Sequence, residues 1–247
     1  MAIPERNEII LGFHDICDQF DWSVNSIRFE KFRQFAEILK AEKNSRVRFL
    51  FDDGFESVAK LANADPSLFL PFRPAMSIIT SQIGGTSVWD RRPGGTGKNH
   101  ISREQLRTLS DSGWEIVSHT HSHRALDLLS HDQIKRELAG SSEILEEIAG
   151  KPVTSLSFPF GRFNQKVVDT CIEFGITTFY SNRKGMNGVN RVYSVYRWDS
   201  TNQLMQKVRH GRIESARLKL INLFSAGTVW VQAYNGLYSE PKSNKNV

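Results

Sequence analysis

The sequence predicts an α/β fold in which parallel strands form a closed or nearly closed barrel. Short apolar runs alternate along the chain with stretches of helical character, which favours parallel strands joined by right-handed crossovers. Seven such runs fall within roughly 200 residues, and this number favours a barrel over an open sheet. The chain has 247 residues, of which 39% are hydrophobic and 24% are charged, so it can bury a substantial core.

The expected elements follow from the order of these segments along the chain. We expect strands at Glu8–Phe13, Val47–Phe51, Ala75–Thr80, Trp114–Ser118, Ser155–Phe158, Thr177–Tyr180 and Val192–Arg197. We expect helices at Phe29–Glu42, Ser57–Asn63, Ser102–Ser112, His131–Ile148 and Gln165–Phe174. Ser102 followed by Gln105 resembles a capping box, and Gly150-Lys151-Pro152 indicates a helix end. Residues 1–239 are expected to form a single domain, followed by a disordered tail at 240–247.

Composition and charge exclude several classes of function. The net charge of +5 indicates mild attraction to anionic surfaces at most, and an ordinary solvated surface explains it better. No dense basic stripe with interleaved aromatic residues occurs, so nucleic acid is not an expected partner. Cys17 and Cys171 form no CxxC pair, which argues against disulfides and cysteine-based metal sites. No apolar run is long enough to span a membrane.

The amino-terminal segment does not have the pattern of a secretory signal peptide. Residues 1–8 carry Glu5, Arg6 and Glu8 before a short apolar run, Ile9–Phe13. We therefore expect a cytoplasmic protein. Its two thiols are expected to be buried in the fold and to stay reduced in that compartment. The sequence specifies no oligomeric state.

Two short motifs carry the chemistry of the chain. Phe51-Asp52-Asp53-Gly54 places two adjacent carboxylates at the end of an expected strand, and His119 and His123 follow a second apolar run. Active sites of parallel barrels collect at the carboxyl ends of the strands, so these groups are expected on one rim. One aspartate and two histidines suffice to hold a zinc-type ion with an open position for water. The second aspartate would lie beside that water, as in a metal-assisted hydrolase.

Each motif also has a purely structural explanation. Asp53-Gly54 alone is typical of a turn after a strand, but two neighbouring carboxylates repel each other unless a cation or other donors hold them. A single histidine at the start of a helix is more often structural than a ligand. Two histidines at positions i and i+4 share a helix face, and together with the aspartate pair they favour metal binding. His121 would point elsewhere on such a helix, and we assign it no ligand role.

These residues resemble the motifs of the polysaccharide deacetylase superfamily, also called the NodB-homology or carbohydrate esterase family 4 group. Phe51-Asp52-Asp53-Gly54 is similar to its first motif, His119-Thr120-His121-Ser122-His123 to its second, and Ser157-Phe158-Pro159-Phe160-Gly161 to its third. The resemblance covers most of the chain, from about His14 to Asp199. It implies a distorted (β/α)7 barrel and a metal-dependent deacetylase that removes the N-acetyl group of an amino sugar or glycan as acetate.

Two positions depart from the pattern of that family. The third motif usually carries an arginine that supports the catalytic aspartate, and Ser157 stands in its place. The family also has a late Leu-x-His strand whose histidine protonates the leaving amine, but the late run Thr228–Ala233 has no histidine. Leu11-Gly12-Phe13-His14-Asp15 resembles that motif moved to the amino end, as in circularly permuted members of the poly-N-acetylglucosamine deacetylase type. Arg197 is then the candidate for the missing arginine.

The resemblance implies a role for each candidate residue. Asp53, His119 and His123 would ligate a divalent ion, expected to be zinc, with cobalt, nickel and manganese also compatible with these ligands. The expected catalytic groups are Asp52 as general base, His14 as general acid, Arg197 as the partner of Asp52 and the backbone N–H of Phe160 as oxyanion donor. The expected partner is an N-acetylated sugar or glycan substrate.

Two other functions are compatible with the same residues. One is a metal-dependent amidase acting on a nucleotide-linked, lipid-linked or non-sugar amide, which the missing secretion signal favours. The other is a glycan-binding barrel without catalysis, which the departures at Ser157 and in the late strand favour. Intact Asp52, Asp53, His119 and His123 argue against the second, because a binding module needs no base beside a metal. Without the family argument, His14 is equally well explained as an ordinary residue at a strand end.

Overall fold

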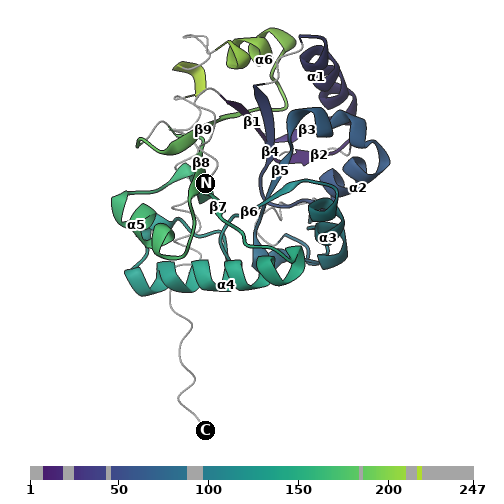
Figure 1. The fold of residues 1–247 in the computed structure, drawn as a ribbon. Coiled ribbons are helices and arrows are strands. Elements are labelled where there is room, and N and C mark those ends of the chain that lie inside the picture. Colours follow the sequence, from purple (N-terminus) through teal and green to yellow (C-terminus); the bar gives the residue numbers. More distant parts are fainter. Residues whose placement is uncertain are drawn as a thin grey trace.

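The computed structural model describes residues 8–18, 25–42, 46–87, 97–183, 186–209 and 216–218. Within these residues, seven parallel strands close into a barrel in the order β1-β4-β5-β6-β7-β8-β9. Helices lie around the outside of the barrel (Figure 1). The predicted closed barrel of parallel strands is therefore confirmed.

The elements alternate along the chain as strand and helix. The barrel strands are β1 (Ile9–Phe13), β4 (Val47–Phe51), β5 (Ala75–Ile78), β6 (Glu115–Ser118), β7 (Ser155–Ser157), β8 (Thr178–Ser181) and β9 (Val189–Ser194), while β2 (Asp15–Ile16) and β3 (Ser26–Ile27) form a small separate sheet. The α-helices are α1 (Phe29–Ala41), α2 (Glu56–Ala64), α3 (Arg103–Asp111), α4 (His131–Ala149), α5 (Gln165–Glu173) and α6 (Thr201–Val208). The short 3-10 helices are η1 (Pro66–Leu68), η2 (Leu70–Phe72), η3 (Thr80–Gln82), η4 (Leu126–Leu128) and η5 (Pro159–Gly161).

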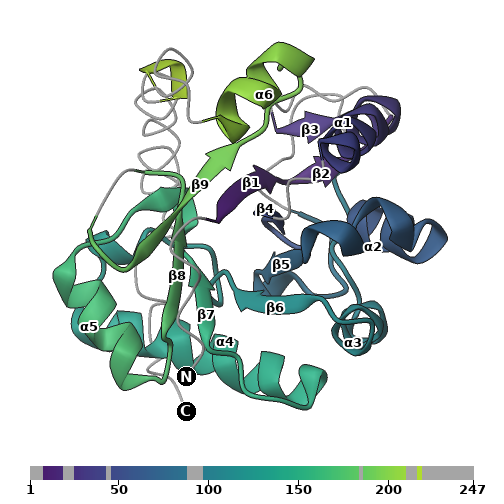
Figure 2. The same ribbon diagram turned by 45° about the horizontal axis from the view of Figure 1, so that its top comes forward.

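Helices α2, α3, α4 and α5 follow one another around the outside of the barrel, each in contact with the next (Figure 2). The strands β8 and β9 are parallel neighbours, yet only residues 182–188 connect them. This connection is shorter than the dozen or more residues of an ordinary crossover. None of the helices in the described ranges is long and apolar enough to cross a membrane.

The expected elements agree with the structure except near the carboxyl end. β4 has the expected bounds, and the other barrel strands before β9 begin and end within one or two residues of their expected limits. β9 runs from Val189 to Ser194 rather than from Val192 to Arg197, so Arg197 lies in the loop before α6. We did not predict α6 or the small sheet of β2 and β3. The late run Thr228–Ala233 and the tail at 240–247 lie outside the described residues.

The ends of the helices follow local signals in the sequence. The Ser102 hydroxyl accepts a hydrogen bond from the Gln105 N–H, and the Gln105 side chain accepts one from the Ser102 N–H, which confirms the predicted capping box of α3. Helix α4 ends at Gly150, whose φ of 67° is the left-handed conformation that commonly terminates a helix. The first signal determines where α3 begins, and the second determines where α4 ends.

Side chains inside the barrel alternate with side chains that face the helices, because successive residues of a strand point to opposite faces. An apolar layer fills the middle of the barrel, made of Ile10, Leu50, Ala75, Val117, Tyr180 and Val192. Two positions before Leu50 and Val117 stand Arg48 and Glu115, which form an ion pair at the amino end of the strands. Two positions after them stand Asp52 and His119, at the carboxyl end. The period of two therefore directs both polar residues into the rim of the barrel.

A cluster of aromatic rings packs between the barrel and its first helices and fixes this register. The rings of Phe49 and Phe72 stack with centroids 4.1 Å apart, and the Phe51 ring lies 5.6 Å from that of Trp114. Burying one such ring stabilises the fold by about 2 kcal/mol. A slip of one residue in β4 would turn the Phe49 and Phe51 side chains into the barrel interior. The same slip would turn the Asp52 side chain toward the surrounding helices. The packing of these rings thus determines the direction of the Asp52 side chain.

Candidate metal centre and active site

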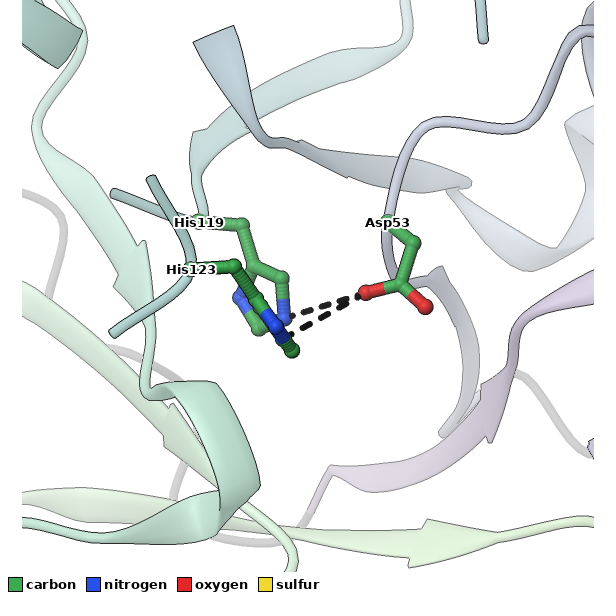
Figure 3. Close-up of side chains that lie close together, drawn as sticks. All are labelled: Asp53, His119 and His123. Atoms are coloured by element: carbon green, nitrogen blue, oxygen red, sulfur yellow. Dashed lines mark ion pairs between the residues drawn. The ribbon is translucent and has the colours of Figure 1, made fainter. Parts of the chain in front are cut away.

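Asp53, His119 and His123 each bring one potential ligand atom to a common point at the rim of the barrel (Figure 3). Asp53 Oδ1 lies 3.5 Å from His119 Nε2 and 3.6 Å from His123 Nε2, and all three atoms lie within 4.8 Å of one another. Ligand atoms about 2.1 Å from a tetrahedral ion are about 3.4 Å apart. One oxygen and two nitrogens at these separations therefore fit a zinc-type ion. The structure brings together the three residues predicted as ligands.

Asp53 lies in a tight turn directly after β4. Its φ of 73° and the φ of 71° at Gly54 both fall in the left-handed region, which an aspartate adopts only at a cost in energy. Two contacts from the segment before α3 hold this turn. His100 Nδ1 lies 2.9 Å from the Asp53 carbonyl oxygen, and the Ile101 N–H donates to the Gly54 carbonyl oxygen at 2.9 Å. Sequence reasoning missed His100, because a single histidine in a polar stretch has no distinctive spacing.

His119 and His123 approach each other through a loop and not along a helix. β6 ends at Ser118, and Thr120 and His123 have φ values of 67° and 58°, which no α-helix contains. The Thr120 hydroxyl accepts a hydrogen bond from the His123 N–H at 3.1 Å and closes the turn. The two imidazole rings end with centroids 4.8 Å apart. The expectation of a shared helix face was therefore wrong, although the two histidines do converge.

The histidine loop is anchored to α4 and to η3. Glu137 is buried on α4 and accepts hydrogen bonds from the Ser122 N–H, at 2.8 Å, and from the Ser122 hydroxyl. His121 Nδ1 lies 3.0 Å from the Thr80 hydroxyl, so this third histidine is engaged outside the ligand cluster. These contacts hold the loop and limit how far His119 and His123 can separate.

The electrostatics of the cluster favour the ligating protonation states of Asp53 and His123 and oppose that of His119. Burial alone would raise the pKa of Asp53, but the hydrogen bond from His119 and the nearby histidine charges outweigh it and hold that pKa far below its usual range. Burial, together with the charge of His119, lowers the pKa of His123 to about 3. Burial also opposes charge on His119, but its hydrogen bond with Asp53 and the charges of Asp52 and Asp53 raise its pKa. At neutral pH, Asp53 is therefore ionised and His123 is neutral.

Asp52 lies beside the cluster with one of its carboxylate oxygens fixed. Asp52 Oδ1 accepts a hydrogen bond from the Ser77 hydroxyl on β5 and another, at 3.0 Å, from the Ser157 hydroxyl on β7. We predicted an ion pair between Asp52 and Arg197 instead, and no such pair occurs among the described residues. Arg197 lies in the loop after β9, where its carbonyl oxygen accepts a hydrogen bond from Lys31 Nζ at 2.7 Å. Sequence reasoning did not find Ser77, because a serine within an apolar strand gives no signal.

His14 and Phe160 complete the rim. His14 follows β1, and its charge contributes to the low pKa values of Asp53 and His123, which places it near the ligand cluster. Its Nδ1 is buried and has no hydrogen-bond partner in the described part of the chain. The Phe160 ring packs against the His123 ring with centroids 4.7 Å apart. The Phe160 N–H, in the turn η5 after β7, donates no hydrogen bond to the described residues.

Strained backbone conformations gather at this rim. The non-glycine residues of the described chain with positive φ are Asp53, Arg73, Thr120, His123 and Phe160, and all but Arg73 belong to the site. Such conformations cost about 1–3 kcal/mol each and persist only where the surrounding structure enforces them. Their concentration here indicates that the fold is built to hold these side chains in place.

Comparisons with known proteins relate this closed barrel, with its Asp–His–His cluster at the rim, to the polysaccharide deacetylases. Residues 75–179 match the family model described as Polysaccharide deacetylase. Over 102 residues the chain is 30% identical to YxkH of Bacillus subtilis (strain 168), which is named among the polysaccharide deacetylases. That match covers 38% of this chain and 37% of the length of YxkH. The resemblance predicted from the sequence motifs is confirmed.

Solved structures show the same fold. The polysaccharide deacetylase BC0361 from Bacillus cereus is 20% identical, with a TM-score of 0.65 over 81% of this chain and 68% of that one. IcaB from Ammonifex degensii is 17% identical, with a TM-score of 0.65 over 81% of this chain and 94% of that one. The Streptococcus pyogenes deacetylase PplD, solved with acetate, is 17% identical, with a TM-score of 0.63 over 81% and 97% of the two chains.

Proposed function

We propose that this chain is a metal-dependent deacetylase that hydrolyses the N-acetyl group of an amino sugar or glycan and releases acetate. The observation that carries the proposal is the convergence of Asp53, His119 and His123 within 4.8 Å, beside a second carboxylate that is anchored at Asp52. Three protein ligands leave a coordination position open, which is typical of catalytic and not of structural metal sites. The similarity to polysaccharide deacetylases supplies the class of substrate.

Asp53, His119 and His123 would hold the divalent ion, with zinc as the first candidate and cobalt, nickel and manganese as alternatives. When bound, such an ion would polarise the acetyl carbonyl group and make a water molecule more acidic. The Ser157 carbonyl oxygen lies 2.8 Å from His119 Nδ1, so it orients the ring and leaves Nε2 for ligation. The anchored histidine loop and the turn at Asp53 would keep the three ligand atoms at fixed separations.

Asp52 would act as the general base and accept the proton of the attacking water. Its Oδ1 already accepts hydrogen bonds from Ser77 and Ser157, whereas Oδ2 accepts none among the described residues. The proton would therefore go to Oδ2 as the new oxygen–carbon bond to the acetyl group forms. Fixing one oxygen leaves the other in a constant direction, which a general base needs in order to reach its proton.

Phe160 would serve the attack of water on the acetyl group, and His14 the departure of the amine. His14, in its protonated form, would donate a proton to the sugar nitrogen as the carbon–nitrogen bond breaks, which yields acetate and a free amine. The Phe160 N–H, without an acceptor in the described chain, would donate to the oxygen on which negative charge develops. The packing of the Phe160 ring on His123 would keep this N–H at a constant distance from the ligand cluster.

The test measures bound metal and acetate release on the same protein samples. Metal is determined by elemental analysis after purification without chelator, and acetate is measured with chitooligosaccharides, nucleotide-linked N-acetyl sugars and non-sugar acetamides. The variants are His119→Ala and a control, His131→Ala, which removes a histidine from the start of α4, where its Nδ1 contacts the Thr170 hydroxyl. We expect about one equivalent of metal and acetate release in the wild type and the control, and neither in His119→Ala.

Each alternative function has its own result in this test. Activity confined to nucleotide-linked or non-sugar amides would replace the glycan substrate with a small amide. Failure to bind zinc, cobalt, nickel or manganese, even after soaking, would refute the metal-dependent hydrolase. No acetate release from metal-loaded protein, together with binding of the same chitooligosaccharides in a calorimetric titration, would indicate a barrel that binds without catalysis.

A further inference from the structure

The carboxylate of Asp52 is held by two neutral side chains from two other strands. Ser77 on β5 and Ser157 on β7 both donate their hydroxyl protons to the same oxygen, Oδ1. Both serines are buried, with exposed fractions of 0% and 4%. Within the described residues, Asp52 makes no ion pair with a lysine or arginine. Two serine hydroxyls therefore hold this carboxylate oxygen.

The strand register accounts for this arrangement. Leu50 and Ala75 belong to the apolar layer inside the barrel, so Asp52 and Ser77, two positions further along β4 and β5, also point inward. Ser155 lies inside the barrel as well, where its hydroxyl donates to Glu115, and Ser157 follows two positions later. β5 and β7 stand on either side of β6 in the barrel. The two serines therefore approach Asp52 from different strands and fix both its position and its rotation.

We propose that Ser77 and Ser157 form a clamp that positions Asp52 as the general base, in place of a cationic partner. The proposal rests on the proposed deacetylase function and adds two positioning residues to it. Hydrogen bonds from hydroxyl groups to a carboxylate restrict its rotation without cancelling its charge. Because both donors occupy Oδ1, Oδ2 keeps the full capacity to accept a proton. Each serine acts through Asp52 and does not contact substrate.

Ser157 has a second contact that makes the clamp testable on its own. Its backbone carbonyl oxygen accepts the hydrogen bond from His119 Nδ1, whereas its hydroxyl binds Asp52. Replacing the side chain with alanine removes only the second contact. Ser157→Ala should therefore leave metal binding through His119 intact while it frees the Asp52 carboxylate to rotate.

The experiment compares Ser77→Ala, Ser157→Ala and the double variant with the wild type. Ser155→Ala is the matched control, because Ser155 lies in the same strand, is equally buried at 4%, and contacts Glu115 at the far end of the barrel. We expect each single variant to lower kcat about tenfold, as the loss of a hydrogen bond to a charged group would, with KM and metal content unchanged. Ser155→Ala should keep kcat, and Ser157→Thr, which retains the hydroxyl, should recover most of the loss. Unchanged kcat in the double variant would overturn the clamp.

A crystal structure of the metal-loaded double variant gives a second readout that does not need activity. The clamp requires Asp52 to occupy several rotamers once both hydroxyls are gone, while it keeps a single rotamer in Ser155→Ala. A single, unchanged Asp52 rotamer in the double variant would also overturn the clamp. A wild type that releases no acetate from any substrate would refute the deacetylase function and leave this structural result to decide the clamp separately.

Discussion

His119 Nδ1 lies 2.8 Å from the carbonyl oxygen of Ser157. A backbone carbonyl can only accept, so Nδ1 of His119 carries a proton and donates it. In the neutral ring the lone pair is then on Nε2, the atom that faces Asp53 at 3.5 Å. The pairing of β6 with β7 therefore selects the tautomer of His119 that a metal ligand would need.

The protonation of His119 predicts how metal affinity depends on pH. Burial opposes charge on this ring, but the hydrogen bond with Asp53 and the two carboxylate charges raise its pKa above the usual value of 6.5. His123 has a pKa of about 3 and the pKa of Asp53 is lowered, so neither competes for protons near neutrality. Binding must therefore displace a proton from His119. Below its raised pKa, we expect the apparent affinity to weaken about tenfold for each pH unit of acidification.

Calorimetric titration with zinc checks this pH dependence. The titrations are run between about pH 5 and about pH 6.5, below the range in which zinc-bound water itself ionises. Buffers with different ionisation enthalpies report the number of protons released, which we expect to be at least one per ion. Binding that releases no proton and does not change in strength over this range would contradict the assignment of His119 as a ligand.

Asp52→Asn separates the base from the metal site. The amide has nearly the same shape as the carboxylate and can still accept hydrogen bonds from Ser77 and Ser157 through its oxygen, so fold and metal content should be preserved. It cannot take a proton from water, and we expect turnover to fall by at least about a hundredfold. Steady-state acetate release at equal metal occupancy measures the effect. Turnover near that of the wild type would remove Asp52 from the role of base.

His14→Ala tests the general acid through the leaving group. The variant should retain metal, because His14 is not one of the three residues of the ligand cluster. It should release acetate from N-acetyl sugars about a hundredfold more slowly than the wild type. An aryl acetate ester needs no protonation to leave, so its hydrolysis should change far less in the same variant. Equal losses on both substrates, or loss of metal, would show that His14 does not protonate the leaving group.

The barrel was predictable because each strand carries its own signal. Val47–Phe51 and Glu115–Ser118 are short, mostly buried runs that polar residues follow, and this pattern is local. β9 was misplaced because its first half, Val189–Arg191, is only partly buried and polar, while the apolar run continues past the strand to Tyr196. Helix α6 carried a usable signal in the capping box of Ser200 and Gln203, which we did not use.

The site was predictable only where a motif is continuous in sequence. Asp53, His119 and His123 stand in two short motifs, whereas Ser77 and His100 act through contacts that depend on which strands and loops are neighbours. The helix expected at the histidines failed for a related reason. The spacing of His119 and His123 does not report the positive φ values of the loop, which only the packing against α4 and η3 imposes.

Gly54, in the turn at Asp53, and Gly84 together separate two free-energy costs of adding a side chain: the cost of a positive φ and the cost of a steric conflict. Both have left-handed backbones, with φ values of 71° and 72°. An alanine Cβ at Gly84 would meet nothing within 4 Å, whereas at Gly54 it would lie 3.0 Å from Ile78 Cδ1 and 3.6 Å from Ile101 Cγ2. Gly84→Ala should therefore lower the free energy of unfolding by about 1 kcal/mol, the cost of the backbone conformation alone. Gly54→Ala adds a steric conflict in the core and should cost about 3 kcal/mol.

Urea unfolding of the metal-free proteins measures both free energies, and zinc titration of the same samples measures the effect on the site. Because Gly54 directly follows Asp53, a backbone shift that relieves the conflict with Ile78 would move the aspartate, and zinc affinity should then fall at least about tenfold in Gly54→Ala. Gly84→Ala should bind zinc as the wild type does. Equal stabilities of the two variants, or unchanged affinity in Gly54→Ala, would mean that the turn tolerates a side chain and that its geometry does not depend on glycine.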